Sequence, residues 1–333
     1  MKYLAPFIAF WFLTGCSSEK PSDSSEKPAD DAALIKTDVF EAGTDDYAIF
    51  RIPGLIVTSK GTLIAFCEAR KTGGGDWGAI DIMMRRSMDQ GKSWSPMVNL
   101  TANSPKITKN QVALNQDLGA ETGQTHNNAV MIVDKDDETI HLLYCIEYAR
   151  CYYAYSKDDG KTFSEPVDIT NTFELFRPDY DWKVLATGPG HGIQLQNGRL
   201  IVPVWLSTGT GGHAHRPSCV TSIYSDDQGK TWQRGDIIAN DPDPLKNPSE
   251  TVAVELADGT VMFNIRNENE IHRRAVTISP DGATNWSRPE FDSELFEPIC
   301  MGHILRLTTK EDSDKNRIIF ANPDSRNIGD DQR

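Results

Sequence analysis

Short apolar runs, separated by turns rich in Gly, Ser, Asp or Asn, follow one another through most of the chain. Residues 54–57 and 62–66 are two such runs, split by a polar turn at 59–61, and a third run follows at 81–84. Apolar runs of this length between turn residues are typical of β-strands. The pattern therefore predicts strand, turn, strand, loop and strand in this part of the chain.

The same order of runs returns in three further units. Each has two apolar runs split by a short turn, then a loop, then a third run. The runs are residues 129–133, 139–143 and 151–155; 192–195, 200–204 and 220–224; and 252–256, 261–265 and 275–278. The pattern thus predicts a chain built from repeated β-units.

An eight-residue turn follows the third run of every unit. It begins at Ser87, Ser156 and Ser225 with the pattern Ser-x-Asp-x-Gly-Lys-Ser/Thr-aromatic, and a degraded copy begins at Ser279. The Asp side chain can accept hydrogen bonds from the turn's own amides, Gly can adopt the left-handed backbone conformation, and the aromatic residue anchors the turn. A fourth strand after this turn completes each predicted unit.

Four-stranded units at this period are typical of an all-β propeller, in which each blade buries a face against its neighbours. A β-sandwich is the alternative, but it has no reason to repeat an eight-residue turn after every third strand. Composition agrees with one large all-β domain, because 38% of the residues are hydrophobic and 25 Gly and 18 Pro supply turns.

The formal net charge is −14. This charge argues against nucleic acid as a partner, because a phosphate-binding surface needs an excess of Lys and Arg. We predict no cofactor and no metal. The glycine-rich segment 209–212 lacks the strand–turn–helix context of a phosphate loop, and His213 and His215 are interpreted as polar loop residues.

Residues 1–16 are predicted to be a lipoprotein signal peptide. An apolar stretch at 5–13, too short to span a bilayer, leads into Leu-Thr-Gly-Cys, which ends at Cys16. Cleavage before Cys16 would leave its thiol and amine to carry acyl chains; an ordinary secretory peptide cut near Gly15 is the alternative. Residues 17–34 are predicted to be a flexible tether. We expect an exported protein, lipid-anchored to a bacterial membrane on its periplasmic or cell-surface side.

The cysteines other than Cys16 number five, which does not indicate a disulfide framework. Cys145 and Cys151 flank a five-residue loop and could pair. Buried thiols on strands are the state that we expect.

Charged and glycine-rich motifs gather in the first unit. In order they are an Arg-Ile-Pro at Arg51, a Glu-Ala-Arg that ends at Arg70, a glycine loop with Asp76, and the eight-residue turn. Further motifs lie at 188–203, 250–259, 264–267 and 297–300. In this order of motifs the chain resembles the bacterial exo-sialidase (neuraminidase) family of retaining glycoside hydrolases, in which the turn is the Asp box, or BNR repeat.

The resemblance spans residues 35–333 and implies a six-bladed β-propeller that acts on sialylated glycans. The family binds the sialic acid carboxylate with three arginines, and the matching positions are Arg51, Arg266 and Arg333. Arg70 matches a fourth arginine beside the hydroxyl groups of the sugar. A guanidinium fork suits a planar carboxylate, whereas each arginine taken alone would be interpreted as a surface ion pair.

The resemblance also implies two catalytic carboxyl groups. Asp76 matches the acid/base, which protonates the glycosidic oxygen and later deprotonates water, and this role requires surroundings that can raise its pKa. Alternatively, Asp76 only stabilises a glycine turn. Glu250 matches the carboxylate that activates a tyrosine nucleophile, since sialidases are exceptions to the usual two-carboxylate scheme.

The family's nucleophilic tyrosine has no counterpart in this sequence. A fifth unit, with runs at 302–307 and 317–321, has no Asp box, and the sequence ends at Arg333. Closing six blades would need on the order of sixty further residues. We therefore expect the last blades to be incomplete in this sequence and residues 17–333 to show little or no activity.

Two functions are compatible with these patterns. The first is an exo-α-sialidase that releases terminal sialic acid from glycoproteins, glycolipids or oligosaccharides by a retaining mechanism. The second is a non-catalytic glycan-binding or scaffold propeller that keeps the arginines and lacks the nucleophile. The presence of both Asp76 and Glu250 favours the first, because a pure binding protein has no need of both.

Overall fold

The computed structural model describes residues 36–119 and 123–324. The chain divides into two units, Met1–Asp38 and Val39–Arg333, and all the helices and strands of the structure lie in the second. The predicted signal peptide with Cys16, the predicted tether and Arg333 lie outside the described residues. No helix within 36–119 or 123–324 is long and apolar enough to cross a membrane.

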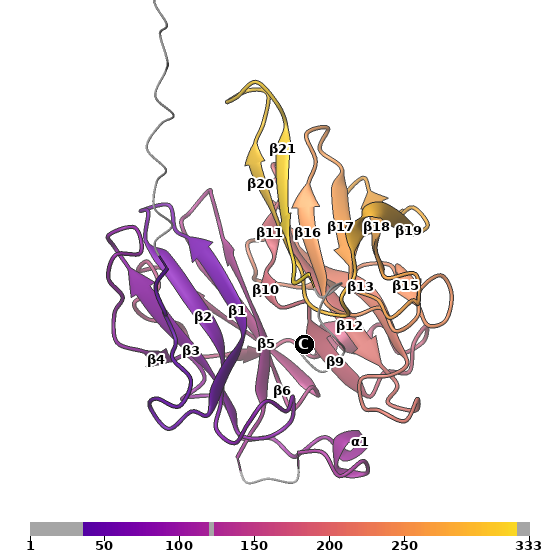
Figure 1. Cartoon of the computed structure of the whole chain (residues 1–333), viewed down its shortest axis with the longest axis horizontal. Coiled ribbons are helices and arrows are strands. Elements are labelled where there is room, and N and C mark those ends of the chain that lie inside the picture. Colours follow the sequence, from indigo (N-terminus) through magenta and orange to yellow (C-terminus); the bar gives the residue numbers. More distant parts are fainter. Residues whose placement is uncertain (1–35, 120–122, 325–333) are drawn as a thin grey trace, which may run out of the picture. The chain divides into compact units, whose positions relative to one another are not determined.

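Four β-sheets follow one another along the second unit as blades of a β-propeller (Figure 1). The first blade is antiparallel in the order β1-β2-β3-β4. Its strands are β1 (Ile49–Val57), β2 (Leu63–Arg70), β3 (Ile80–Ser87) and β4 (Val98–Asn99). The β1–β2 register changes after Arg51, where Ile52 has a positive φ of 55°. This irregularity lies at the end of the blade that carries the predicted site residues.

The second and third blades share one segment of the chain. The second blade has the order β10-β5-β6-β7-β8, and the third is built around β11-β12-β13-β14, with β9 on β12 and β15 on β13. The second-blade strands are β5 (His126–Val133), β6 (Ile140–Ile146), β7 (Arg150–Ser156), β8 (Val167–Asp168) and β10 (Gly190–His191). Those of the third are β9 (Val184–Thr187), β11 (Ile193–Gln194), β12 (Leu200–Ser207), β13 (Ser218–Ser225), β14 (Gln233–Arg234) and β15 (Ala239–Asn240). Residues 184–191 thus supply a strand to each blade, and β10 pairs with β5 in parallel.

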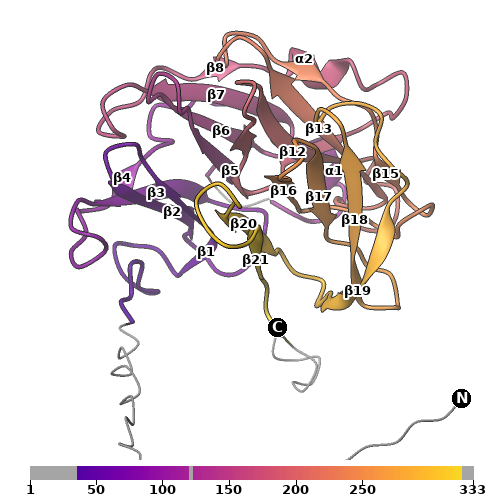
Figure 2. The same ribbon diagram turned by 90° about the horizontal axis from the view of Figure 1, so that it is seen from above.

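The fourth blade is antiparallel and is followed by a hairpin. Its strands are β16 (Thr251–Glu255), β17 (Val261–Ile265), β18 (Arg273–Ser279) and β19 (Glu290–Phe296), and the hairpin is β20 (His303–Thr308) with β21 (Arg317–Ala321). Arg306 of the hairpin donates a hydrogen bond of 2.7 Å from Nη2 to the carbonyl oxygen of Glu255. Two short helices, α1 (Gln111–Leu114) and α2 (Asn171–Glu174), lie in the connecting loops. Figure 2 shows the sheets from above.

The Asp boxes have the internal hydrogen bonds that the sequence predicts. In the first blade Ser93 N donates to Asp89 Oδ1 (2.9 Å) and Gly91 N donates to Ser87 Oγ (2.8 Å). The degraded copy keeps the equivalent bonds, since Thr284 N donates to Asp281 Oδ1. The prediction of a repeated β-propeller is therefore confirmed for four blades.

The Asp boxes also join each blade to the one before it. Asp159, in the box of the second blade, accepts hydrogen bonds from Thr58, Thr62 and Arg86 of the first blade at 2.6 to 2.7 Å. A Cβ on Gly229, in the third box, would lie 2.5 Å from the hydroxyl oxygen of Tyr153 in the second blade. The third Asp box therefore packs against the second blade with no space for a side chain at position 229.

The core lies between neighbouring sheets. One apolar cluster joins the first and second blades, another joins the second and third, and a third joins the third and fourth. Cys145 and Cys151 face each other across β6 and β7 as buried free thiols, as expected for cysteines on strands. The four blades are thus held by burial between sheets and by their Asp boxes.

Candidate functional site

A cavity of about 210 Å³ gathers side chains from all four blades. Its residues lie at strand ends and in the loops that join them. The lining is Ile52, Glu68, Arg70 and Asp76 from the first blade; Asn128 and Tyr148 from the second; Trp205, His213, His215, Arg216 and Ser218 from the third; and Asn247, Ser249, Glu250, Arg266 and Glu268 beside or within the fourth. Four residues predicted from the sequence, far apart in the chain, therefore meet in one place: Arg70, Asp76, Glu250 and Arg266.

Arg70 ends β2 and is buried, with 2% of its side chain exposed. Its Nε and Nη2 atoms donate to Glu68 Oε2 at 3.2 and 2.6 Å. Its Nη1 atom donates to the carbonyl oxygens of Gly74 (2.5 Å) and Gly75 (2.8 Å) and to Asp76 Oδ1 (2.9 Å). The guanidinium is thus occupied by the glycine loop, residues 71–79, whereas the resemblance implies an arginine beside the hydroxyl groups of a sugar.

Arg51 lies on β1 and meets the same loop from the solvent side. Its Nη1 atom donates to the Gly74 carbonyl oxygen at 2.7 Å and lies 3.7 Å from Asp76 Oδ1. The Arg51 side chain is 44% exposed, so an anion can reach it. Arg51 and Arg70 therefore place two guanidinium groups beside one carboxylate.

The surroundings of Asp76 are positively charged and favour its ionised form, whereas a proton donor must be protonated. Burial by itself raises its pKa, but Arg70, His215 and Arg51 together outweigh burial, so the pKa of Asp76 lies below its usual value. The acid/base role predicted from the sequence requires the opposite shift. In this arrangement Asp76 is an ionised carboxylate held by Arg70.

Glu250 and Arg266 form an ion pair next to the ends of β16 and β17. The Arg266 backbone amide also donates to the Glu250 carbonyl oxygen at 3.1 Å, so the two residues are fixed side by side. The Nε atom of Arg266 is buried and has no hydrogen-bond partner among the described residues. Glu250 thus balances the charge of Arg266 where both residues line the cavity.

Aromatic side chains that the sequence patterns did not single out form one wall of the site. The ring of Tyr148 lies 4.6 Å from that of Trp77 and 4.7 Å from that of His215, between ring centroids. Tyr148 and its neighbour Glu147 both have positive φ values, 47° and 52°, in the turn between β6 and β7. Left-handed backbone is costly for bulky residues and is concentrated at functional sites. The sequence offered one signal for this strained turn: the segment between β6 and β7 contains neither Gly nor Asn, the residues that adopt a positive φ most readily.

The sequence prediction for His213 and His215 was a polar loop, and the structure places both in the cavity wall. Burial lowers the pKa of His215 to about 3, so its imidazole is neutral near pH 7. No group of three or more His, Cys, Asp or Glu side chains suited to a metal ion occurs among residues 36–119 and 123–324. The backbone amide of His215 donates a hydrogen bond of 3.1 Å to His213 Nδ1.

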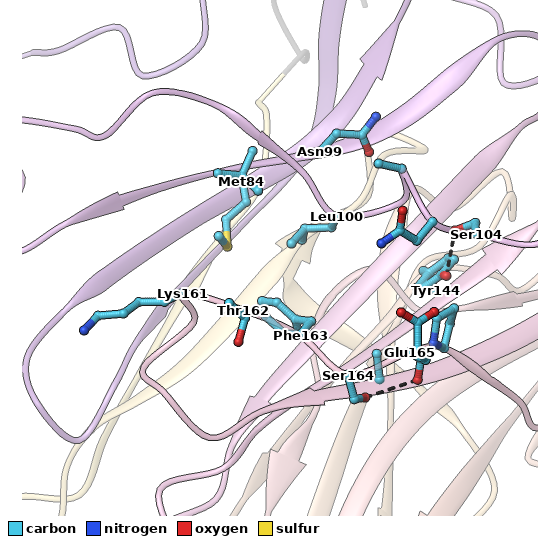
Figure 3. A pocket seen from close by; sticks show the side chains of 15 residues that line it. Met84, Asn99, Leu100, Ser104, Tyr144, Lys161, Thr162, Phe163, Ser164 and Glu165 are labelled. Carbon is cyan, nitrogen blue, oxygen red and sulfur yellow. Dashed lines mark hydrogen bonds between the residues drawn. The ribbon is translucent and has the colours of Figure 1, made fainter.

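A second cavity lies between the first and second blades and contains none of the predicted catalytic residues (Figure 3). Met84, Tyr144 and Phe163 line it, and Lys161 and Glu165 stand at its surface. The hydroxyl groups of Ser104 and Tyr144 share a hydrogen bond of 2.7 Å. The residues predicted to be catalytic line the first cavity instead.

Repeated blades with Asp boxes define a β-propeller, and its cavity is lined by arginines beside carboxylates. The family model described as "BNR repeat-like domain" matches residues 107–325. The chain belongs to this family.

Similar proteins include several sialidases. A sialidase of Bacteroides fragilis is 28% identical over 311 residues, which are 86% of this chain and 52% of that protein. Human sialidase-3 is 30% identical over 290 residues, 80% of this chain and 64% of that protein. The solved structure of the Hadza microbial sialidase Hz136 matches with a TM-score of 0.63 and 26% identity, over 81% of this chain and 52% of that one. The chain thus spans about half the length of several of these relatives.

Proposed function

We propose that this protein is an exo-α-sialidase, a retaining glycoside hydrolase that releases terminal sialic acid from glycans. The observation that carries the proposal is the meeting of Asp76, Glu250 and Arg266 in one cavity, with Arg51 3.7 Å from Asp76. The similarity to proteins named sialidase supports it.

Each residue has a defined task in the proposed reaction. Arg51 and Arg266 bind the carboxylate of the sugar, because paired guanidinium groups match its shape and charge. Asp76 gives a proton to the glycosidic oxygen, so that the leaving group departs neutral, and then takes a proton from the attacking water. Glu250 is the base for the nucleophile, and its ion pair with Arg266 holds it in place. Arg333 is proposed as the third carboxylate ligand from the sequence alone.

We also propose that the four blades belong to a six-bladed ring. The outward faces of β1 and of the hairpin carry large apolar side chains that are about half exposed: Leu55 52%, Val57 56%, Leu305 55%, Leu307 52% and Ile319 48%. Open strand edges and apolar faces of this kind favour association with further strands. Additional blades would cover them.

The activity is tested with sialyllactose and an aryl sialoside, with product formation followed by proton NMR. A retaining enzyme releases the α-anomer first, and Asp76→Asn is expected to slow hydrolysis of sialyllactose more than hydrolysis of the aryl sialoside, whose leaving group needs less protonation. The same assay on residues 17–333 tests the expectation of little or no turnover. Binding of sialyllactose without hydrolysis by any form of the protein would favour the glycan-binding alternative.

Residues 1–16 motivate a proposal on localisation. We propose that the protein is exported and anchored through lipid on Cys16, with 17–34 as the tether. Incorporation of a labelled fatty acid that is lost in Cys16→Ser is the expected result. Secretion of unlabelled wild-type protein would instead support the alternative cleavage near Gly15.

A further inference from the structure

Two arginines hold the glycine loop, and they differ in how firmly they do so. The Arg70 side chain is 2% exposed and is fixed by its ion pair with Glu68. Arg51 is 44% exposed and has one strong contact with the loop, the hydrogen bond of 2.7 Å to the Gly74 carbonyl oxygen. One arginine is therefore a permanent support, and the other can exchange its partner.

The exchangeable arginine is the one to which the proposed function assigns the ligand carboxylate. The Nη1 atom of Arg51 that donates to Gly74 also faces Asp76 Oδ1 at 3.7 Å. An ionised carboxylate is a stronger acceptor than a neutral carbonyl and can bind a guanidinium with two parallel bonds. A bound sugar acid therefore competes with the Gly74 carbonyl oxygen for Arg51 and is the stronger acceptor.

We infer that Arg51 is a positioning residue for Asp76 as well as a carboxylate ligand, and that ligand binding takes Arg51 away from the loop and so makes Asp76 a proton donor. This inference rests on the proposed function, since it uses the same site. It adds a coupling between the two ends of the ligand: the carboxylate that binds at Arg51 prepares the acid that acts on the glycosidic oxygen.

The charges around Asp76 give the direction of this coupling. The titratable groups that face Asp76 are Arg51, Glu68, Arg70, Tyr148, His213 and His215. Without a ligand the cations prevail, and the pKa of Asp76 is lowered. A ligand carboxylate neutralises Arg51 and adds a negative charge nearby, and both changes favour the protonated form of Asp76. Binding should therefore take up a proton.

The test measures proton uptake directly by isothermal titration calorimetry. The probe is 2-deoxy-2,3-didehydro-N-acetylneuraminic acid, a carboxylate-bearing sugar analogue, titrated at pH 5.5 in two buffers of different ionisation enthalpy. We expect the wild-type protein to take up at least about 0.3 proton per bound ligand. Asp76→Asn should bind the analogue without proton uptake, and Arg51→Met should bind it at least about tenfold more weakly.

A matched control is Asp226→Asn. Asp226 is 47% exposed and contacts Arg199 at 2.7 Å, and Asp76 is 43% exposed and contacts Arg70 at 2.9 Å, but Asp226 lies outside the cavity. This variant should keep the proton uptake of the wild type, and thermal unfolding checks that all variants fold. Binding with no proton uptake in the wild type, or uptake that persists in Asp76→Asn, overturns the inference and leaves the proposed function intact. No binding of the analogue overturns both.

Discussion

Arg70 and Glu68 form an ion pair of 2.6 Å in which each side chain is only 2% exposed. Both lie on β2, two residues apart, so their side chains leave the strand on the same face. Glu68 Oε1 also accepts a hydrogen bond of 2.9 Å from the backbone amide of Asn128, which ties the pair to the second blade. The support of the glycine loop is therefore part of the core.

Arg70→Met should lower the free energy of unfolding by about 3–5 kcal/mol, because it leaves the Glu68 carboxylate buried without its partner. Arg51→Met is the matched variant at the other side of the loop, and because Arg51 is 44% exposed it should change stability by less than about 0.5 kcal/mol. Urea unfolding followed by tryptophan fluorescence measures both. Equal losses in the two variants would contradict the different roles assigned to these arginines.

Gly229→Ala should destabilise the protein more than Gly91→Ala. Both glycines are in Asp boxes and have positive φ, 78° and 86°, so both alanines pay the same backbone cost. The new Cβ would lie 2.5 Å from the Tyr153 hydroxyl oxygen at position 229, but 3.5 Å from the nearest Leu63 carbon at position 91. We expect an additional loss of about 1–3 kcal/mol at position 229. Denaturant midpoints for the two variants give the comparison, and similar midpoints would mean that the boxes do not join the blades.

Stability should fall as the pH drops below about 6.5. Burial, followed by the nearby His303, lowers the pKa of His191 to about 3, and burial also lowers the pKa values of His126 and His141. Between pH 6.5 and about 3 the unfolded chain binds a proton at His191 and the native state does not, so this site can cost up to about 1.4 kcal/mol per pH unit. His126 and His141 act in the same direction, because burial lowers their pKa values too. Above pH 6.5 the histidines are neutral in both states and contribute no pH dependence.

His191→Gln isolates one part of this effect. The variant should have a shallower loss of unfolding free energy between pH 7.5 and pH 5 than the wild type, whatever its stability at pH 7.5. Unfolding curves at a series of pH values provide the slopes. Parallel curves would show that His191 binds a proton in the native state as readily as in the unfolded chain.

In a form of the protein that has all six proposed blades, Glu250→Gln should lower kcat for a sialoside by about 100-fold or more, while binding of the carboxylate-bearing analogue changes by less than about fivefold. The amide cannot act as a base, but its oxygen can still accept a hydrogen bond from Arg266. Glu268→Gln is the control, since Glu268 lines the same cavity and pairs with Arg216 at 2.6 Å. Unchanged turnover in Glu250→Gln would remove Glu250 from the mechanism.

The strands and turns of the repeated units could be predicted from the sequence because they depend on local pattern. The runs predicted at 129–133 and 151–155 lie within β5 and β7, and the run predicted at 139–143 begins one residue before β6. The prediction was less accurate for the run at 192–195, since β11 is only Ile193–Gln194 and β9 pairs with the rest of this edge of β12. The parallel pairing of β10 with β5 joins segments about sixty residues apart, and no local pattern encodes it.

The site residues could be predicted in part. Motif order pointed to Asp76, Glu250 and Arg266, which line one cavity. The pairing of Arg70 with Glu68 could have been inferred from their spacing on a strand. The burial of this pair, which makes it important for stability, depends on packing against the second blade. Tyr148 was missed because its place in the cavity follows from a strained turn, and strain is a property of the folded structure.

The two strands formed by residues 184–191 affect the order in which the blades fold during synthesis. The first blade has all its strands within residues 49–99 and can close as soon as these emerge from the ribosome. The second blade cannot, because its β5 edge is completed by β10, which is made after β9 of the next blade. Since chains fold from the N-terminus as they are made, we expect the second and third blades to become protease-resistant together, as one unit, on nascent chains of increasing length.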